Sequence, residues 1–231
     1  MAKHGKYYQN ARSRIEEREY GLEEAVALLR ELKRPKFVES ADISIRLGVD
    51  PKYPEQNVRG TVVLPHGTGR QVRVLVIAAG EKIKEAEEAG ADHVGGEEIV
   101  EKIRTESWFD FDTVVTTPDM MRHVGKLGKM LGPKGLMPSP KAGTVTFNLK
   151  ETVEEIKKGR VEFKVDKTGI INSSIGKMTF EDGPLADNVR SFVQAVLKAR
   201  PASLKGRYVR SMYLSTTMSP GVKLSLQEFE R

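Results

Sequence analysis

The sequence has 231 residues, enough for one large domain or two smaller ones with a hydrophobic core. It contains no cysteine, which excludes a disulfide framework and any thiolate metal site. The net charge of +6 and the pI of about 9.4 favour acidic partners, nucleic acid first among them, although many soluble proteins are mildly basic.

Other classes of protein are disfavoured by simple patterns. His4, His66, His93 and His123 are scattered and form no helical metal-binding pair, so we expect no metal and no cofactor. No apolar run follows the basic N-terminus, and no stretch approaches the length of a membrane span. We therefore expect a soluble, cytoplasmic protein that does not bind membranes.

The first part of the chain alternates helical and extended patterns. Residues 6–19 are charged and compatible with a helix. Residues 21–33 carry an apolar stripe that predicts an amphipathic helix, which Pro35 stops. Alternating apolar and polar residues predict half-buried strands over 37–48 and 58–64.

The pattern changes beyond the turn at 65–69. Residues 72–79 form a nearly continuous apolar run, which is typical of a strand covered on both faces. This middle part also predicts helices over 81–89 and 97–105, a buried strand over 112–117, a helix from Asp119, a short strand over 144–147 and a short helix over 153–158.

The alternating pattern returns after Gly159. It predicts strands over 161–165, 170–175 and 208–214. Between the last two, an apolar stripe predicts a long helix over 182–198. The two chain ends therefore resemble each other more than either resembles the middle.

This difference predicts two domains, one of them discontinuous. Residues 1–66 and 160–231 would form one domain, and residues 67–159 an inserted α/β domain. The two crossings, at Gly67 and Gly159, would act as a hinge. The net charges of the segments 1–66, 160–231 and 67–159 are +2, +5 and −1 in that order, so the discontinuous domain is the better candidate for a nucleic-acid surface.

One segment of the inserted domain has an unusual composition. Residues 124–138 place glycine or proline every few positions with lysines between, and Asp119 is the only acid from 118 to 141. Glycines allow close backbone approach to phosphate, and lysines add positive charge. The simple alternative is a solvated surface loop, but a basic loop in an otherwise acidic domain favours a phosphate contact.

Nucleotide-binding and catalytic motifs are missing. The spacing from Gly128 to Pro133 does not fit a P-loop, and Val72 occupies the third glycine position of a dinucleotide motif that would begin at Gly67. The sequence has no G-x-S-x-G elbow, and its paired carboxylates are typical of helix surfaces. We therefore predict that the protein is not an enzyme. A nucleotide-binding enzyme and a general nucleic-acid chaperone are the competing hypotheses.

Two segments of the discontinuous domain have features of a recognition surface. Residues 36–40 place an aromatic residue beside a base at the start of a strand, although Phe37 taken alone is more typical of a core position. Residues 215–221 provide small hydroxyl groups, which can bond phosphates and 2′-hydroxyls of RNA.

Several ordered motifs resemble the family of bacterial large-subunit ribosomal protein one, the protein of the lateral stalk. They extend over nearly the whole chain. The motifs are Gly5-Lys6-Tyr7, Leu47-Gly48-Val49-Asp50-Pro51, Gln56-Asn57-Val58-Arg59-Gly60-Thr61-Val62, Leu64-Pro65-His66-Gly67-Thr68-Gly69, Gly80-Glu81-Lys82-Ile83-Lys84-Glu85-Ala86, Ala89-Gly90-Ala91-Asp92, Leu131-Gly132-Pro133-Lys134-Gly135-Leu136-Met137-Pro138, Pro140-Lys141-Ala142-Gly143-Thr144-Val145, Asp166-Lys167-Thr168-Gly169 and Ser215-Thr216-Thr217-Met218.

The resemblance implies both a fold and a site. The fold class is α/β and α+β, a discontinuous α+β sandwich domain with an inserted three-layer, Rossmann-like α/β domain. The first domain would hold the principal rRNA site and the second a further RNA contact. Matched by position, the principal site comprises Lys36, Phe37, Glu39, Ser40, Asp166, Lys167, Thr168, Thr216, Thr217 and Met218, and the secondary contact comprises Lys126, Lys129, Lys134, Gly135 and Lys141. Phe37 would then lie at the surface.

The resemblance also implies partners. They are the large-subunit rRNA of the lateral stalk, the mRNA of the protein's own operon, whose translation it represses, and deacylated tRNA leaving the exit site. We expect a monomer when the protein is free. One departure concerns the order Ser219-Pro220-Gly221, where the family pattern has glycine, proline and serine. If a glycine at 219 allows close approach to RNA, this serine weakens that contact or leaves it to Gly221.

Overall fold

A computed structural model describes residues 5–32 and 36–229, and its chain forms two compact units. Unit 1 comprises Met1–Arg70 and Val161–Arg231, and unit 2 comprises Gln71–Arg160. Each unit has its own hydrophobic core, so each is described separately. Within the described residues, no helix is long and apolar enough to cross a membrane.

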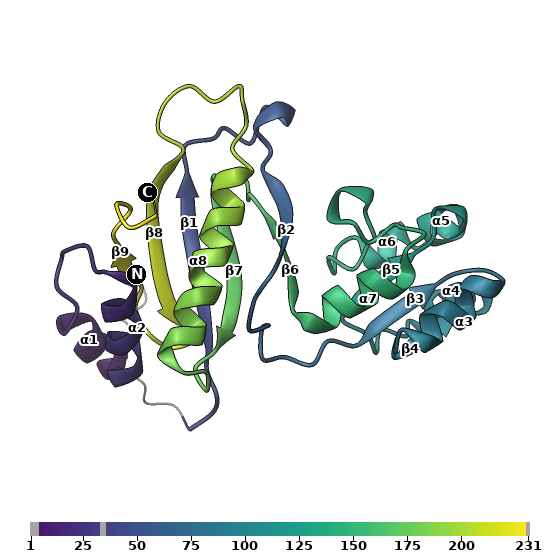
Figure 1. Ribbon diagram of the computed structural model, residues 1–231, viewed down its shortest axis with the longest axis horizontal. Coiled ribbons are helices and arrows are strands. Elements are labelled where there is room, and N and C mark those ends of the chain that lie inside the picture. Colours follow the sequence, from purple (N-terminus) through teal and green to yellow (C-terminus); the bar gives the residue numbers. More distant parts are fainter. Residues whose placement is uncertain (1–4, 33–35, 230–231) are drawn as a thin grey trace. The chain divides into compact units, whose positions relative to one another are not determined.

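Unit 1 is built on an antiparallel sheet in the order β7-β1-β8-β9, with a separate two-stranded sheet of β2 and β6 (Figure 1). Its elements are α1 (Lys6–Ser13), α2 (Leu22–Glu31), β1 (Ser40–Leu47), η1 (Pro54–Gln56), β2 (Arg59–Val63), β6 (Arg160–Lys164), β7 (Ile170–Lys177), α8 (Asp182–Lys198), β8 (Val209–Thr216) and β9 (Val222–Leu224). The predicted end of the first amphipathic helix at Lys33 and its stop at Pro35 lie outside the described residues.

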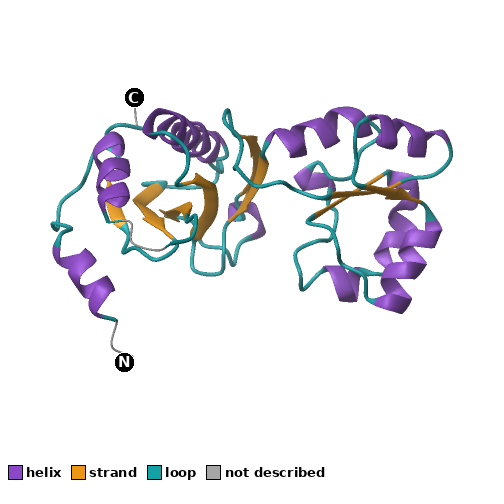
Figure 2. Ribbon diagram, turned by 90° about the horizontal axis from the view of Figure 1, so that it is seen from below, coloured by secondary structure: helices purple, strands orange, loops and turns teal. Residues whose placement is uncertain are grey.

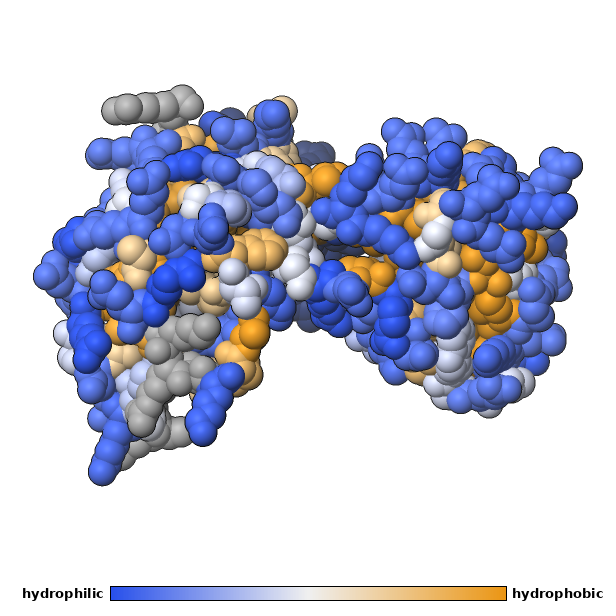
Figure 3. Space-filling view, turned by 60° about the horizontal axis from the view of Figure 1, so that its bottom comes forward, coloured by the Kyte–Doolittle hydropathy of each residue, from blue (hydrophilic) through white to orange (hydrophobic). Residues whose placement is uncertain are grey.

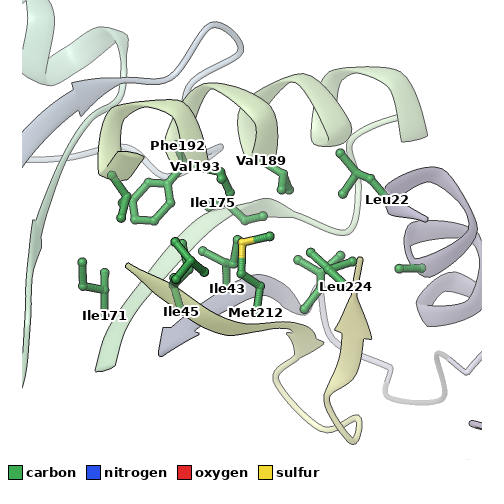
Figure 4. Packing of buried hydrophobic residues seen from close by; sticks show 14 of the residues in the cluster. Leu22, Ile43, Ile45, Ile171, Ile175, Val189, Phe192, Val193, Met212 and Leu224 are labelled. Atoms are coloured by element: carbon green, nitrogen blue, oxygen red, sulfur yellow. The ribbon is translucent and has the colours of Figure 1, made fainter. Parts of the chain in front are cut away.

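One face of this sheet carries the core. Ile43 and Ile45 of β1 pack with Met212 of β8 beneath Phe192 of α8 (Figure 4). The alternation in β1 buries every second residue, which is why its other residues stay polar. Helices α8 and α2 cover this face, and the opposite face of the sheet carries the polar residues. We call that side the open face; it is formed by Asp42, Ser44, Arg46, Asn172, Ser174, Ser211, Tyr213 and Ser215.

A buried asparagine ties the first chain crossing to unit 1. The Asn188 side chain of α8 accepts a hydrogen bond from the His66 N–H (3.1 Å) and donates to the carbonyl oxygens of Gly67 and Ile175 (both 2.9 Å). All of its polar atoms are thus satisfied although the residue is fully buried. The crossing is therefore held to helix α8 and strand β7 at the point where the chain leaves unit 1.

Unit 2 has three layers around a parallel sheet in the order β4-β3-β5. Helices cover both faces of these strands (Figure 2). Its elements are β3 (Val74–Ile77), α3 (Glu81–Glu88), β4 (His93–Gly95), α4 (Glu97–Glu106), β5 (Thr113–Thr116), η2 (Pro118–Met120), α5 (Met121–Gly125), α6 (Gly128–Leu131), η3 (Pro140–Ala142) and α7 (Leu149–Lys158). All four residues of β3 are buried, in agreement with the continuous apolar run.

Two expectations about unit 2 need correction. The strand predicted over 144–147 is only an isolated bridge between Val145 and Thr116, since a segment this short makes few ladder bonds. The Gly/Lys segment 124–138 is not an irregular loop throughout, because α6 forms within it. Buried Leu127 and Leu131 anchor that turn in the core of unit 2.

Candidate nucleic-acid interface

The structure brings together two of the predicted segments, 36–40 and 216–218, at one end of the sheet. The Ser40 N–H donates to the Thr217 hydroxyl oxygen at 3.1 Å, and the Thr217 N–H donates to the Ser40 carbonyl at 3.2 Å. These two residues are far apart in the sequence, and the antiparallel pairing of β1 with β8 makes them neighbours. We call this surface the Thr217 end.

Apolar side chains are exposed at the Thr217 end. Phe37 is 51% exposed, Val38 49% and Met218 50%, which is unusual for residues of this size. The core interpretation of Phe37 is therefore wrong, and the expectation of a surface position is confirmed. Val38 was not among the predicted contact residues; it lies within the strand predicted over 37–48 but before β1, which begins only at Ser40.

Two predicted contact residues lie beneath this surface instead of on it. Glu39 is 1% exposed and Thr216 4%. Glu39 Oε1 accepts hydrogen bonds from the Thr216 hydroxyl and the Met218 N–H, both at 3.0 Å. Glu39 is therefore kept from solvent by burial, and its predicted contact with RNA stays a prediction. Its carboxylate holds the turn that presents Thr217 and Met218.

A cation that sequence reasoning missed completes the Thr217 end. The Lys177 ammonium at the end of β7 donates to the Ser40 hydroxyl at 2.8 Å. Lys36 is exposed nearby in sequence, before the strand begins. Lys177 lies at this surface because β7 pairs with β1 in a register that sets Lys177 opposite Ser40. No local pattern around residue 177 indicates this position. The surface thus combines exposed apolar groups, hydroxyls and positive charge.

The third predicted segment, 166–168, lies at the opposite end of the sheet. The β1–β7 register pairs Ser40 with Lys177 but Arg46 with Ile170, and the Leu47 N–H donates to the Gly169 carbonyl at 2.8 Å. Six residues of strand separate the two ends, roughly 20 Å. The predicted site is therefore two separate clusters. We call the second one the Asp166 end.

The open face connects the two ends. Ser44 lies between Asn172 of β7 and Tyr213 of β8, and its hydroxyl donates to Asn172 Oδ1 at 2.7 Å. Tyr213 is 40% exposed. The polar positions of the alternating strand were the available signal for this surface, but alternation alone does not distinguish a binding face from a solvated one. Hydroxyl and amide groups continue from Thr217 to Thr168 across this face.

The Asp166 end is an ordered turn. Asp166 Oδ1 accepts hydrogen bonds from the Thr168 hydroxyl (2.6 Å), the Thr168 N–H (2.7 Å) and the Ile170 N–H (2.9 Å). These bonds hold the pKa of Asp166 below its ordinary value of 3.8, and the bond from the Thr168 hydroxyl has the largest effect. Lys167 and Thr168 are exposed, so the turn presents both to solvent.

The lowered pKa of Asp166 makes the stability of the fold depend on pH. Because its folded-state pKa is lowered, the carboxylate stabilises the fold above the unfolded-state pKa of about 3.9, and this contribution is lost as the pH falls through the folded-state value. We expect Asp166→Asn to lower the free energy of unfolding at neutral pH by less than about 1 kcal/mol, since solvent screens this exposed group. Urea denaturation from neutral to acidic pH should show the difference shrinking below about pH 4. A difference that does not change with pH would contradict this account.

Ser219, where the chain departs from the family pattern, closes the turn after β8. Its hydroxyl accepts a hydrogen bond from the Thr216 N–H at 2.8 Å and donates to the Pro220 carbonyl at 3.1 Å. Its backbone does not have a positive φ, so the position does not require glycine. A Cβ at position 221 would make only ordinary contacts, the nearest with Tyr213 at 3.6 Å. The serine therefore supports the turn from inside.

The predicted secondary contact lies wholly in unit 2. Its lysines are exposed, and Gly135 has a φ of +72°, a conformation that favours glycine. Lys134 differs from the others because its ammonium lies 3.5 Å above the Phe109 ring. Over the described ranges no ion pair joins these side chains to an acid, which leaves Lys126, Lys129 and Lys141 available to an anionic ligand.

The surface otherwise shows few features of an enzyme site. Hydrophilic residues cover most of the face in Figure 3. The part of the chain that the structure describes contains no cluster of three His, Asp or Glu residues that could hold a metal ion. A cavity of about 320 Å³ in unit 2 is lined by Glu85, Glu151 and Glu154 with Asn148 and Lys150. Such an acidic lining does not favour a nucleotide, whose phosphates are negatively charged.

Comparisons with known proteins agree with the motifs in the sequence. Residues 28–220 match the Ribosomal protein L1p/L10e family. The chain is 55% identical over 227 residues to the large ribosomal subunit protein uL1 of Solibacter usitatus, covering 98% of this chain and 96% of that protein. It is 54% identical over 230 residues to the large ribosomal subunit protein uL1 of Persephonella marina, covering 98% and 95%.

Proposed function

Because the chain belongs to the Ribosomal protein L1p/L10e family, we propose that it is a structural protein of the large ribosomal subunit and binds the rRNA of the lateral stalk through unit 1. As a member of a ribosomal protein family it is not an enzyme. It would act on the ribosome, in the cytoplasm.

The observation that carries this proposal is the composition of the Thr217 end. Phe37 and Met218 are exposed in the two segments that meet where Ser40 bonds Thr217 and the cationic Lys177. Exposed aromatic rings stack on bases, hydroxyls bond 2′-hydroxyls and phosphates, and lysines attract the backbone. Phe37, Val38 and Met218 are all about half exposed, which is unusual for large apolar side chains on the solvated surface of a monomer.

Two kinds of contact would contribute differently. Lysines and arginines supply affinity that falls with salt, because binding releases counterions from the RNA. Hydroxyl and main-chain groups on the open face supply the preference for one RNA shape. Glu39 and Ser219 act indirectly, by fixing the turn that carries Thr217 and Met218.

We further propose two finer roles. The same surface would bind the mRNA of the protein's own operon and repress its translation, since two RNAs of similar shape compete for one recognition face. The basic segment of unit 2, with Lys126, Lys129 and Lys141, would contact RNA a second time and assist release of exit-site tRNA. Both roles rest on the family resemblance and on the charge and exposure of these residues.

A binding titration with a matched pair of variants tests the main proposal. Phe37→Ala is expected to weaken binding to a stalk rRNA fragment by about 5- to 150-fold, the effect of losing one base stack. Phe147→Ala is the control, since Phe147 is equally exposed (52%) but lies in unit 2. A shape-scrambled RNA serves as competitor.

The outcomes separate the hypotheses. Tight binding that resists the competitor and is lost only in Phe37→Ala supports the proposal. Equal binding to both RNAs would replace it with a general nucleic-acid chaperone. Equal weakening in the two variants would remove Phe37 from the site. Equilibrium dialysis with labelled nucleotides tests the enzyme hypothesis separately, and we expect no saturable binding.

A further inference from the structure

Three arginines at the Asp166 end have no acidic partner among the described residues. Arg46, Arg207 and Arg210 are exposed and form no ion pair there. Some other arginines of unit 1 do form ion pairs, for example Arg59 with an acid on β6 and Arg190 with acids on α2 and α8. Three arginines without an ion pair thus lie together at one end of one sheet.

A β-bulge directs one of these arginines outward. Strand β1 pairs Arg46 with Ser211 of β8 but Leu47 with Val209, so Arg210 is the extra residue. A bulge leaves its extra residue outside the regular ladder and changes the direction of its side chain. Arg210 is exposed, whereas Val209 and Ser211 on either side of it both pair with β1.

A glycine allows these arginines to lie close to β1. The Gly48 N–H donates to the Tyr208 carbonyl at 2.7 Å. A Cβ at position 48 would lie 2.3 Å from the Arg207 carbonyl oxygen and 3.5 Å from Arg210 Nε. The backbone of 207 and the guanidinium of 210 therefore pack against the end of β1, beside Arg46.

The charged groups around these arginines are one lysine and two acids, which are fewer than would neutralise the arginines and the lysine together. Lys167 is exposed in the adjacent turn. Two acids, Asp50 and Asp166, also lie at this end. Asp50 Oδ1 accepts from the Lys52 N–H (3.1 Å) and Asp166 Oδ1 from backbone N–H groups of its own turn, and among the described residues neither forms an ion pair with the arginines. Uncompensated like charges destabilise a fold, so a cluster of this kind indicates an anionic ligand.

We propose that Arg46, Arg207 and Arg210 bind successive phosphates of the RNA strand that crosses the open face from the Thr217 end. The guanidinium group presents a planar fork of donors that matches a phosphate. This inference rests on the proposed function and adds to it the path of the RNA and the residues that supply its salt-dependent affinity. The sequence motifs did not indicate Arg46, Arg207 or Arg210.

The test uses the full chain, the stalk rRNA fragment and a salt series. A triple variant, Arg46→Gln with Arg207→Gln and Arg210→Gln, is expected to reduce the slope of log K against log salt by about 2 to 3, roughly one for each phosphate that is no longer neutralised. Its melting temperature should be unchanged or higher, since charge repulsion is relieved. Arg190→Gln is the control for a change of charge on α8, and its slope should equal that of the wild type.

Each result decides the question. A triple variant with the slope of Arg190→Gln, while the wild type still prefers the stalk RNA to the scrambled RNA, would overturn the phosphate contacts and leave the proposed function intact. A wild type without that preference would overturn the proposed function itself. If the triple variant melts at a markedly lower temperature, the single variant Arg46→Gln decides: an unchanged slope there would assign the arginines a structural role and overturn the inference.

Discussion

Glu39→Ala is expected to lower the free energy of unfolding by about 2 to 4 kcal/mol, because it leaves a buried donor and a partly buried donor without an acceptor. Those donors are the Thr216 hydroxyl and the Met218 N–H, which share Glu39 Oε1. The same change frees the turn that carries Thr217 and Met218, so binding to the stalk rRNA fragment should weaken more than tenfold, about 1.4 kcal/mol or more. Urea denaturation and the RNA titration measure the two effects.

Two further variants make this prediction specific to the acceptor. Glu39→Gln keeps an oxygen at the Oε1 position and should retain most of the affinity, because its charge is not what holds the turn. Glu55→Ala removes an exposed glutamate from the same unit and should have little effect on either measurement. If Glu39→Ala binds RNA as well as the wild type does, the turn is held by other contacts and the positioning role is wrong.

Gly48→Ala is expected to cost about 1 to 3 kcal/mol of stability, because the new methyl group would overlap the backbone of the segment that precedes β8. Its Cβ would lie 2.3 Å from the Arg207 carbonyl oxygen, and no side-chain rotation relieves a backbone contact. The end of β1 must then move away from β8, which disturbs the bulge at Arg210. We therefore expect weaker RNA binding and a smaller salt slope, measured as for the arginine variants.

The matched control is another glycine of unit 1 with free space around it. Gly183 lies in the first turn of α8, and a Cβ there would meet nothing within 4 Å. Gly183→Ala should leave stability unchanged or raise it slightly, since alanine favours the helix. Equal behaviour of the two variants would show that the close approach at Gly48 is not required for the fold.

Much of the secondary structure follows from local patterns. The predicted helix over 182–198 coincides with α8, because its apolar stripe and its polar first turn are properties of one continuous segment. The alternation over 37–48 predicted β1, and the apolar run over 72–79 predicted β3. Strands β4 and β9 were missed because three residues are too few to show a period.

The family and the types of residue in the site also follow from the sequence. Ordered motifs along nearly the whole chain indicated a ribosomal protein family, and the matches to relatives confirm it. The hydroxyl run at 215–221 and the basic segment at 124–138 were visible as compositions. Their roles as RNA contacts remain proposals, to which the titration and the salt series apply.

Only the tertiary structure decided which of these residues lie together and which are accessible. Strand register makes Thr217 a neighbour of Ser40 and places Asp166 at the far end of the same sheet. Glu39 and Ile43 are both buried, and the Thr216 hydroxyl donates to the Glu39 carboxylate. A glutamate between a valine and a serine would, from the sequence alone, be placed at the surface. A local pattern records how one segment divides between core and solvent, whereas the position of a side chain in a site depends on pairing between segments far apart in the chain.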